Sequence, residues 1–233
     1  MEKVIEGSSH LNNNLILLDK KQDRYYSDRK EMIEFIPSNV RQVLDVGCGD
    51  GQFGHLLKSR YDVEAWGIEI LEDVADKAKT RMDKVLVGDI EAEELILPCD
   101  YFDCVVFNDI LEHLRNPWIV LKRIHRNLRK TGCVVASIPN VRYYRNMKEL
   151  LIHKDWEYAD AGVMDKTHLR FFTIKSIRNL FERCEFQVVL IKGIKGAEFP
   201  WKIGLLNSLL FNALDDMRYM QFVCVARKKG PMI

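Results

Sequence analysis

The segment VLDVGCGDG, residues 43–51, predicts a buried strand that ends in a glycine-rich turn. Gly47, Gly49 and Gly51 keep side chains out of that turn, so a ligand can approach the backbone closely. A helix that begins near Gln52 would direct its free N–H groups toward the same point. The segment therefore predicts a ligand site at the carboxyl edge of an α/β sheet.

Short apolar runs alternate with amphipathic segments along the rest of the chain. Helical periodicity fills the intervals, as in Trp118, Leu121, Ile124 and Leu128. This alternation predicts an α/β fold with a mostly parallel sheet, an antiparallel ending and helices on both faces. The expected strands are Gln42–Val46, Val63–Ile68, Lys84–Val87, Phe102–Phe107, Gly132–Ile138, Val188–Ile194 and Gln221–Ala226.

The glycines alone fit two classes of cofactor site. Gly49, Gly51 and Gly54 match the G-x-G-x-x-G pattern of dinucleotide-binding proteins, and Glu69 follows Gly49 by 20 residues, where an acid would bind ribose in either class. Asp45 distinguishes between these two classes of cofactor site, because a carboxylate two residues before Gly47 suits a cationic methionyl amino group and repels a pyrophosphate.

Polar residues at the ends of the later strands narrow the choice. Glu69 ends the second strand, Gly88-Asp89-Ile90 closes the third, and NDILEHL (108–114) follows the fourth. With D-x-G-x-G, this order resembles class I S-adenosylmethionine-dependent methyltransferases over roughly residues 25–195. The resemblance implies a Rossmann-like fold of seven strands, mostly parallel, with the last one antiparallel. It also implies S-adenosylmethionine as the cofactor.

The resemblance assigns parts of the cofactor to residues of this chain. The methionine end would lie against Asp45, Gly47 and Gly49, the ribose against Glu69, and the adenine against Asp89 and Ile90. Further contacts are implied for Ile70 and Asn108. Tyr25, Tyr26 and Arg29 match an upstream helix that often covers the cofactor, expected here over residues 23–36.

Two later segments resemble a narrower group. IPNVRYY (138–144) and DKTHLRFFT (165–173) are similar to bacterial proteins whose cores look like ubiquinone-type O-methyltransferases, many of them associated with glycan or natural-product assembly. This implies methyl transfer to a hydroxyl oxygen of a small molecule or sugar. Nucleic-acid base methylation is disfavoured, because Asn108 is followed by Asp109 where an N-P-P-Y-type motif would stand.

His113 and His168 are the expected catalytic residues, and three roles stay open. One or both can be the general base, since an imidazole titrates near pH 6.5. Alternatively, Asp109, Glu112 and His113 share one face if their segment is helical, and with His168 they could bind a divalent ion. The third interpretation is local pairing of Glu112 and packing of both histidines under a lid.

Two other functions compete with methyl transfer. A nicotinamide-dependent oxidoreductase would use the same glycines, but Asp45 and the NDILEHL segment disfavour it. A non-catalytic scaffold with the methyltransferase fold would typically have lost the glycines or the acid, whereas this chain keeps Gly47, Gly49 and Glu69.

Composition limits the partners and the compartment. The chain has 233 residues and a net charge of +1, from 35 basic and 34 acidic side chains, which gives no electrostatic footprint for nucleic acid. Six cysteines without a C-x-x-C pair fit buried thiols in a reducing compartment. No signal-like N-terminus or spanning apolar run is found, so a cytoplasmic protein without a membrane partner is expected.

We expect residues 1–22 to be loosely ordered and residues 23–233 to form a single methyltransferase domain. Insertions at about 141–173 and 196–216 would form lids over the cofactor edge. Within the second, the leucine spacing predicts a helix over Trp201–Leu214 that covers the acceptor pocket, forms a homodimer contact or packs into the core.

Overall fold

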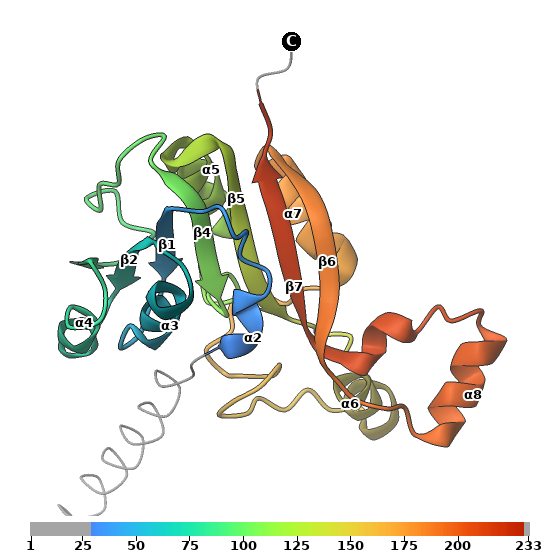
Figure 1. Cartoon of the computed structure of the whole chain (residues 1–233). Coiled ribbons are helices and arrows are strands. Elements are labelled where there is room, and N and C mark those ends of the chain that lie inside the picture. The colour runs from blue at the N-terminus through green and yellow to red at the C-terminus, as the bar shows by residue number, and fades with distance from the viewer. Residues whose placement is uncertain (1–28, 231–233) are drawn as a thin grey trace, which may run out of the picture.

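The strand expected at Gln42–Val46 forms β1, which pairs in parallel with β2 and β4 inside a seven-stranded sheet (Figure 1). The structure is a computed structural model and describes residues 29–230. Its strand order is β3-β2-β1-β4-β5-β7-β6. The described pairings among β1 to β5 are parallel, and β7 runs antiparallel to β5 and β6. The predicted mostly parallel sheet with an antiparallel last strand is confirmed.

Each expected strand overlaps an observed one. β5 begins earlier than predicted, at Leu128 instead of Gly132, because Leu128 already pairs with Phe102 ahead of a register shift. The strands are β1 Gln42–Val46, β2 Glu64–Glu69, β3 Lys84–Val87, β4 Phe102–Asn108, β5 Leu128–Pro139, β6 Phe186–Gly196 and β7 Tyr219–Lys228.

Helices cover both faces of the sheet because side chains alternate along each strand. Val43 belongs to a cluster with α2 (Lys30–Ile33) and α3 (Gln52–Arg60), whereas Leu44 and Val46 belong to a cluster with α5 (Pro117–Asn127) and α7 (Ile174–Arg183). α4 (Glu72–Ala78) packs beside β2 and β3. The helix expected over residues 23–36 is observed only as α2, and residues 23–28 lie outside the described part.

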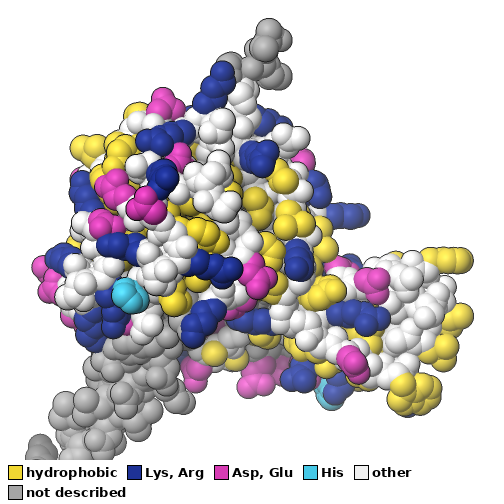
Figure 2. All heavy atoms as spheres, viewed as in Figure 1, with side chains coloured by type: hydrophobic (Ala, Val, Ile, Leu, Met, Phe, Trp, Pro, Cys, Tyr) yellow, Lys and Arg dark blue, Asp and Glu magenta, His cyan; other side chains and the backbone are white. Residues whose placement is uncertain are grey.

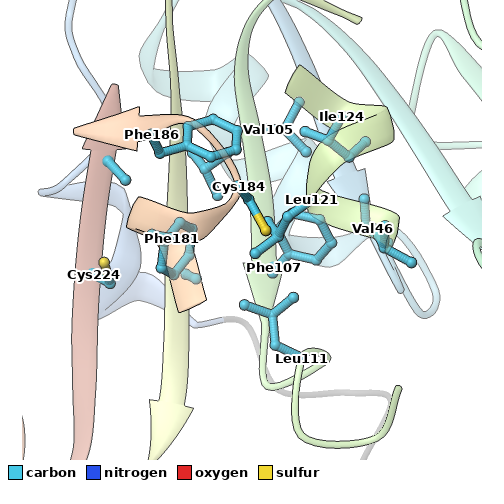
Figure 3. Close-up of a cluster of buried hydrophobic side chains, with 14 of the residues drawn as sticks. Val46, Val105, Phe107, Leu111, Leu121, Ile124, Phe181, Cys184, Phe186 and Cys224 are labelled. Atoms are coloured by element: carbon cyan, nitrogen blue, oxygen red, sulfur yellow. The ribbon is translucent and has the colours of Figure 1, made fainter. Parts of the chain in front are cut away.

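The larger cluster forms the core beneath the carboxyl ends of β1 and β4. Phe107 of β4, Leu121 of α5 and Phe181 of α7 point toward one another there (Figure 3), and all three are fully buried. Leu111, directly after β4, joins the same cluster. The turn that follows β4 is therefore anchored in the core, and with it the neighbouring Glu112 and His113.

Two glycines of the 43–54 segment serve packing. A Cβ atom on Gly51 would lie 2.9 Å from the Cα atom of Ala78, and one on Gly54 would lie 2.6 Å from Cε of Met82. The G-x-G-x-x-G match is thus explained by the close approach of α3 to the α4 end.

Gly51→Ala is expected to destabilise the protein by about 2–4 kcal/mol. The new Cβ would clash with the Ala78 backbone, and a side chain at a φ of +82° would be strained as well. Gly162→Ala is the matched control, since its φ is +86° and no atom lies within 4 Å of the added Cβ. The control should lose only about 1–2 kcal/mol. Denaturant unfolding measures both, and equal losses would contradict the packing role of Gly51.

The two insertions differ in where they lie. Residues 141–173 hold α6 (Tyr144–Lys148), the π-helix η1 (Glu149–His153) and a loop that returns toward the sheet. Residues 196–216 hold α8 (Trp201–Leu209) and lead into the short 3-10 helix η2 (Asp215–Arg218). α8 stands away from the sheet as a projecting arm (Figure 1) and ends at Leu209, short of the predicted Leu214. None of the helices described over residues 29–230 has the length and apolarity to cross a bilayer.

Candidate active site

A cleft of about 860 Å³ opens at the carboxyl ends of the parallel strands. This volume is in the range of small-molecule and cofactor sites. The loops after β1, β2, β3 and β4 line it, together with residues 161–169 of the first insertion and Lys195, Met220 and Gln221. Residues 196–216 contribute nothing to this lining, so α8 does not cover the cleft. A second cleft around His125, at the opposite end of the strands, contains none of the predicted site residues.

The glycine turn after β1 forms one wall of the cleft. Gly47 and Gly49 have φ values of +72° and +56°, a conformation that glycine adopts without strain. The N–H groups of Gly47 and Cys48 donate to the carbonyl of Ile68 at 2.8 and 3.0 Å, which ties the turn to β2. A smooth backbone surface therefore faces the cleft where the sequence predicts the cofactor.

Glu69 shapes this turn as well as lining the cleft. Its carboxylate accepts N–H hydrogen bonds from Gly49 at 3.0 Å, Ile70 at 2.9 Å and Leu71 at 3.0 Å. Burial raises the pKa of Glu69, and the three N–H donors partly offset that effect. A carboxylate has about four acceptor positions, so capacity is left for ribose hydroxyls. The structural role of Glu69 was not predicted from the sequence.

Asp45 lies at the end of β1 with only 2% of its surface exposed. Its Oδ1 atom is buried and has no hydrogen-bond partner among residues 29–230. Burial, and then the nearby Glu69, raise the pKa of Asp45 to about 8. An unpaired buried carboxyl that lines a cleft fits a cationic ligand, because a positive charge beside it would stabilise the ionised form. The methionine ammonium of S-adenosylmethionine fits this position.

The remaining predicted cofactor residues lie around the same cleft. Asp89 accepts the N–H of Glu91 at 2.8 Å, Ile90 is buried, and Ile70 is largely exposed at the rim. The Oδ1 atom of Asn108 is buried without a hydrogen-bond partner in the described structure, so it is available to a ligand. Tyr26 lies outside the described residues. The structure thus brings together around one cleft the predicted cofactor residues that it describes.

Asp109 does not occupy the position expected for a metal ligand. Its φ of +55° and the turn that follows it place residues 109–113 in a non-helical conformation, so the assumed helical face is absent. Instead, its carboxylate accepts from Ser137 Oγ at 2.5 Å and Gln221 Nε2 at 2.9 Å, and pairs with Arg29. This network links the segment after β4 to β5, to β7 and to the residue that precedes α2. The network depends on contacts between residues that are distant in sequence, so no sequence motif predicted it.

His113 and His168 do converge. Their ring centroids are 4.7 Å apart, and Nδ1 of His113 and of His168 lies 3.2 Å and 3.0 Å from the carbonyls of Thr167 and Val163. Those contacts assign the ring proton to Nδ1 and leave Nε2 as the basic atom. Burial lowers the pKa of His168, which keeps it neutral at neutral pH.

Glu112 lies directly beside the histidine pair. Its Oε1 atom is 3.9 Å from Nε2 of His168, and both carboxyl oxygens are buried without a hydrogen-bond partner within residues 29–230. Burial and the neighbouring Asp109 raise the pKa of Glu112 well above its usual range. Both pKa shifts favour the neutral forms of these groups, and 3.9 Å is longer than a hydrogen bond, so the contact is a weak one. Ligand atoms of Glu112, His113 and His168 all lie within 4.8 Å of one another.

Comparisons with known proteins agree with this geometry. A family model described as a methyltransferase domain matches residues 18–191. The 27-O-demethylrifamycin SV methyltransferase of Amycolatopsis mediterranei is 33% identical over 97 residues, which cover 39% of this chain and 36% of that enzyme. The malonyl-[acyl-carrier protein] O-methyltransferase of a Paenibacillus species is 28% identical over 104 residues, covering 41% of this chain and 38% of that enzyme. Both matches thus span well under half of each relative.

Solved structures support the fold. An S-adenosylmethionine-dependent methyltransferase from Archaeoglobus fulgidus superposes with a TM-score of 0.63 at 19% identity, covering 92% of this chain and 99% of that one. A second, from Mesorhizobium loti, has a TM-score of 0.61 at 16% identity and covers 87% and 99%. The family model matches well over half of the length of this chain. The chain therefore belongs to the methyltransferase-domain family and is a class I S-adenosylmethionine-dependent methyltransferase.

Proposed function

We propose that the chain transfers the methyl group of S-adenosylmethionine to a hydroxyl oxygen of a small-molecule or glycan acceptor, and that it acts in the cytoplasm. The observation that carries the choice of a hydroxyl is the histidine pair beside the cofactor wall, with both Nε2 atoms basic. A hydroxyl must lose its proton as the methyl group is transferred, and an imidazole is suited to accept it. One relative above is an O-methyltransferase by name and the name of the other gives an O-demethylated acceptor, which supports an oxygen atom as the methyl acceptor.

The bound cofactor supplies an electrophilic methyl group, so the residues of this chain have mainly to bind, align and exclude water. The glycine turn, Asp45 and Glu69 would hold the cofactor against one wall. The acceptor would bind against the other lining segment, which consists of residues 161–169 with Lys195 and Gln221. His113 is only partly buried and lines the cleft, which makes it the proposed base.

A second arrangement is favoured by the unpaired carboxyl of Glu112. A divalent ion held by Glu112, His113 and His168 would satisfy both orphaned oxygens and would lower the pKa of an acceptor hydroxyl. Hydrogen bonds from Nδ1 to backbone carbonyls are typical of histidines that bind metals through Nε2. Asp109 is not part of this set, because its carboxylate is committed elsewhere.

His113→Ala is expected to reduce turnover by about 10²–10⁴-fold if the imidazole is the base, with no response to a chelator. The assay follows labelled methyl transfer to a panel of sugars and phenols, and His55→Ala serves as the control far from this cluster. Chelator-sensitive turnover that a divalent ion restores, together with loss of bound metal in His168→Ala, would favour the metal arrangement. Near-normal rates in both histidine variants would reject both arrangements and leave a packing role.

A further inference from the structure

The loop that carries His168 also carries two polar side chains whose contacts lead to His113. Asp165 is buried, and its carboxylate accepts the N–H of Thr167 at 2.8 Å and the Thr167 hydroxyl at 2.7 Å. The Thr167 hydroxyl oxygen in turn lies 3.3 Å from Nδ1 of His113. A chain of contacts therefore runs from a buried carboxylate through a hydroxyl to the histidine ring.

The direction of each hydrogen bond in this chain is fixed. A hydroxyl has one proton to donate, and Thr167 gives it to the carboxylate, so the hydroxyl oxygen accepts from the ring of His113. The Thr167 carbonyl, 3.2 Å from the same Nδ1 atom, can only accept as well. Both contacts therefore require a proton on Nδ1, and in the neutral ring Nε2 keeps its lone pair.

Backbone hydrogen bonds hold this loop against the segment after β4. The N–H groups of Leu169 and Arg170 both donate to the carbonyl of Glu112, at 2.9 and 3.0 Å. Glu112 directly precedes His113, so these bonds keep Thr167 beside the histidine ring. The loop lies below the sheet in Figure 1, at the carboxyl ends of the parallel strands.

Asp165 also shapes the loop itself. Its side chain accepts the N–H two residues further on, which is an Asx turn, and its carbonyl accepts the N–H of His168 at 2.9 Å. An asparagine could form the same turn through its side-chain oxygen. The turn by itself therefore accounts for an oxygen at this position, whereas the second bond, from the Thr167 hydroxyl, links the carboxylate to His113.

Groups close to His113 set the environment of its ring. On the face shown in Figure 2, basic and acidic side chains are interspersed, and no large region of that face has one sign. Salt screens exposed charges over about 10 Å but screens a buried charge much less. Thr167 is exposed, and its hydroxyl would rotate freely in water, so the buried Asp165 carboxylate is what fixes that hydroxyl.

We propose that Asp165 and Thr167 are positioning residues for His113: the carboxylate orients the hydroxyl, and the hydroxyl holds the ring with its proton on Nδ1. Nε2 is thereby kept basic, for the proton of the acceptor or for a divalent ion. Carboxylates that act on a histidine through its other nitrogen serve both of these uses in proteins. The proposal deepens the proposed function and rests on it, since His113 is the residue that the pair serves.

Nitrogen-15 NMR of the histidine rings, without acceptor and with a chelator present, tests the chain of hydrogen bonds. The shifts of the two ring nitrogens distinguish Nδ1–H from Nε2–H, and the spectrum of His113→Gln identifies the His113 signals among six histidines. At a pH where the ring is neutral, the wild type should show Nδ1–H. Thr167→Val removes the hydroxyl and should give a mixture with Nε2–H, whereas Thr167→Ser should keep the wild-type spectrum. Thr80→Val, at an exposed threonine outside the cleft, is the control.

Labelled methyl transfer gives the functional reading. Thr167→Val should lower kcat about tenfold to a hundredfold without changing KM for S-adenosylmethionine, and Thr167→Ser should recover most of the turnover. Asp165→Asn keeps the turn oxygen but loses the charge, so its kcat should fall between those two. Asp160→Asn, at an exposed carboxylate in the same insertion, is the control. Binding of S-adenosylhomocysteine shows that each variant is folded.

The outcomes for the positioning role and for the proposed function are separate. A wild-type ring with Nε2–H would overturn the positioning role, and so would a wild-type tautomer or a wild-type kcat in Thr167→Val, even where His113→Ala is inactive. A loss in Thr167→Ser as large as in Thr167→Val would also overturn it, because the hydroxyl would then not be the group that matters. Near-normal turnover of His113→Ala would instead reject the proposed function, whatever the tautomer of the ring.

Discussion

Asp45→Asn is expected to stabilise the ligand-free protein at about pH 8.5 and to weaken cofactor binding about a hundredfold or more. The two effects have one cause, the buried carboxyl with its unpaired Oδ1. The folded-state pKa of about 8 lies above the ordinary value of 3.8, so the folded protein holds a proton that the unfolded chain has lost. Stability is therefore highest below about pH 4 for this group and falls as pH rises through about 8.

The full pH-dependent loss is on the order of 5 kcal/mol for Asp45 alone. Asparagine removes this loss because it does not ionise, but it cannot pair with the methionine ammonium. Unfolding at about pH 5.5 and about pH 8.5 measures the first effect, and calorimetry with S-adenosylhomocysteine measures the second. Asp62→Asn, an exposed carboxyl 96% accessible at its side chain, is the control. Parallel pH slopes for wild type and Asp45→Asn would contradict the buried-charge explanation.

Glu69→Ala is expected to cost about 2–4 kcal/mol of stability and to reduce cofactor affinity about tenfold to a hundredfold. The alanine leaves three N–H groups, of Gly49, Ile70 and Leu71, without their acceptor. It also removes the predicted hydrogen bonds to ribose. The stability effect follows from bonds within the protein and should appear without any ligand.

Glu69→Gln separates the two roles. Its carbonyl oxygen can still accept from Ile70 and Leu71, both of which bond to Oε1, while its amide would face the N–H of Gly49. Most of the stability should return, but not the cofactor affinity. Denaturant unfolding and calorimetry with S-adenosylhomocysteine provide the two readings, with exposed Glu72→Ala as the control. A fully stable Glu69→Ala would show that the carboxylate does not hold the turn.

The position of each strand could be read from the sequence because buried parallel strands require continuous apolar runs between turn residues. The same holds for the cofactor wall: Asp45, Glu69, Asp89 and Asn108 each follow or end a strand, and parallel strands bring their carboxyl ends to one edge. Chemistry and order along the chain therefore sufficed to predict the family, the cofactor and the residues around the cleft.

Contacts between distant segments decided the rest. Helical spacing made Asp109 one possible ligand in one of the three roles left open, yet its backbone is not helical, and its carboxylate bonds to Arg29, Ser137 and Gln221. Glu69 holds the glycine turn through bonds to backbone groups that no residue pattern encodes. The spacing of the leucines in α8 indicates a helix, but this spacing would be the same in a lid, in a core helix and in a projecting arm. Only the tertiary structure sets the direction in which the chain leaves β6, and that direction left the leucines exposed to solvent.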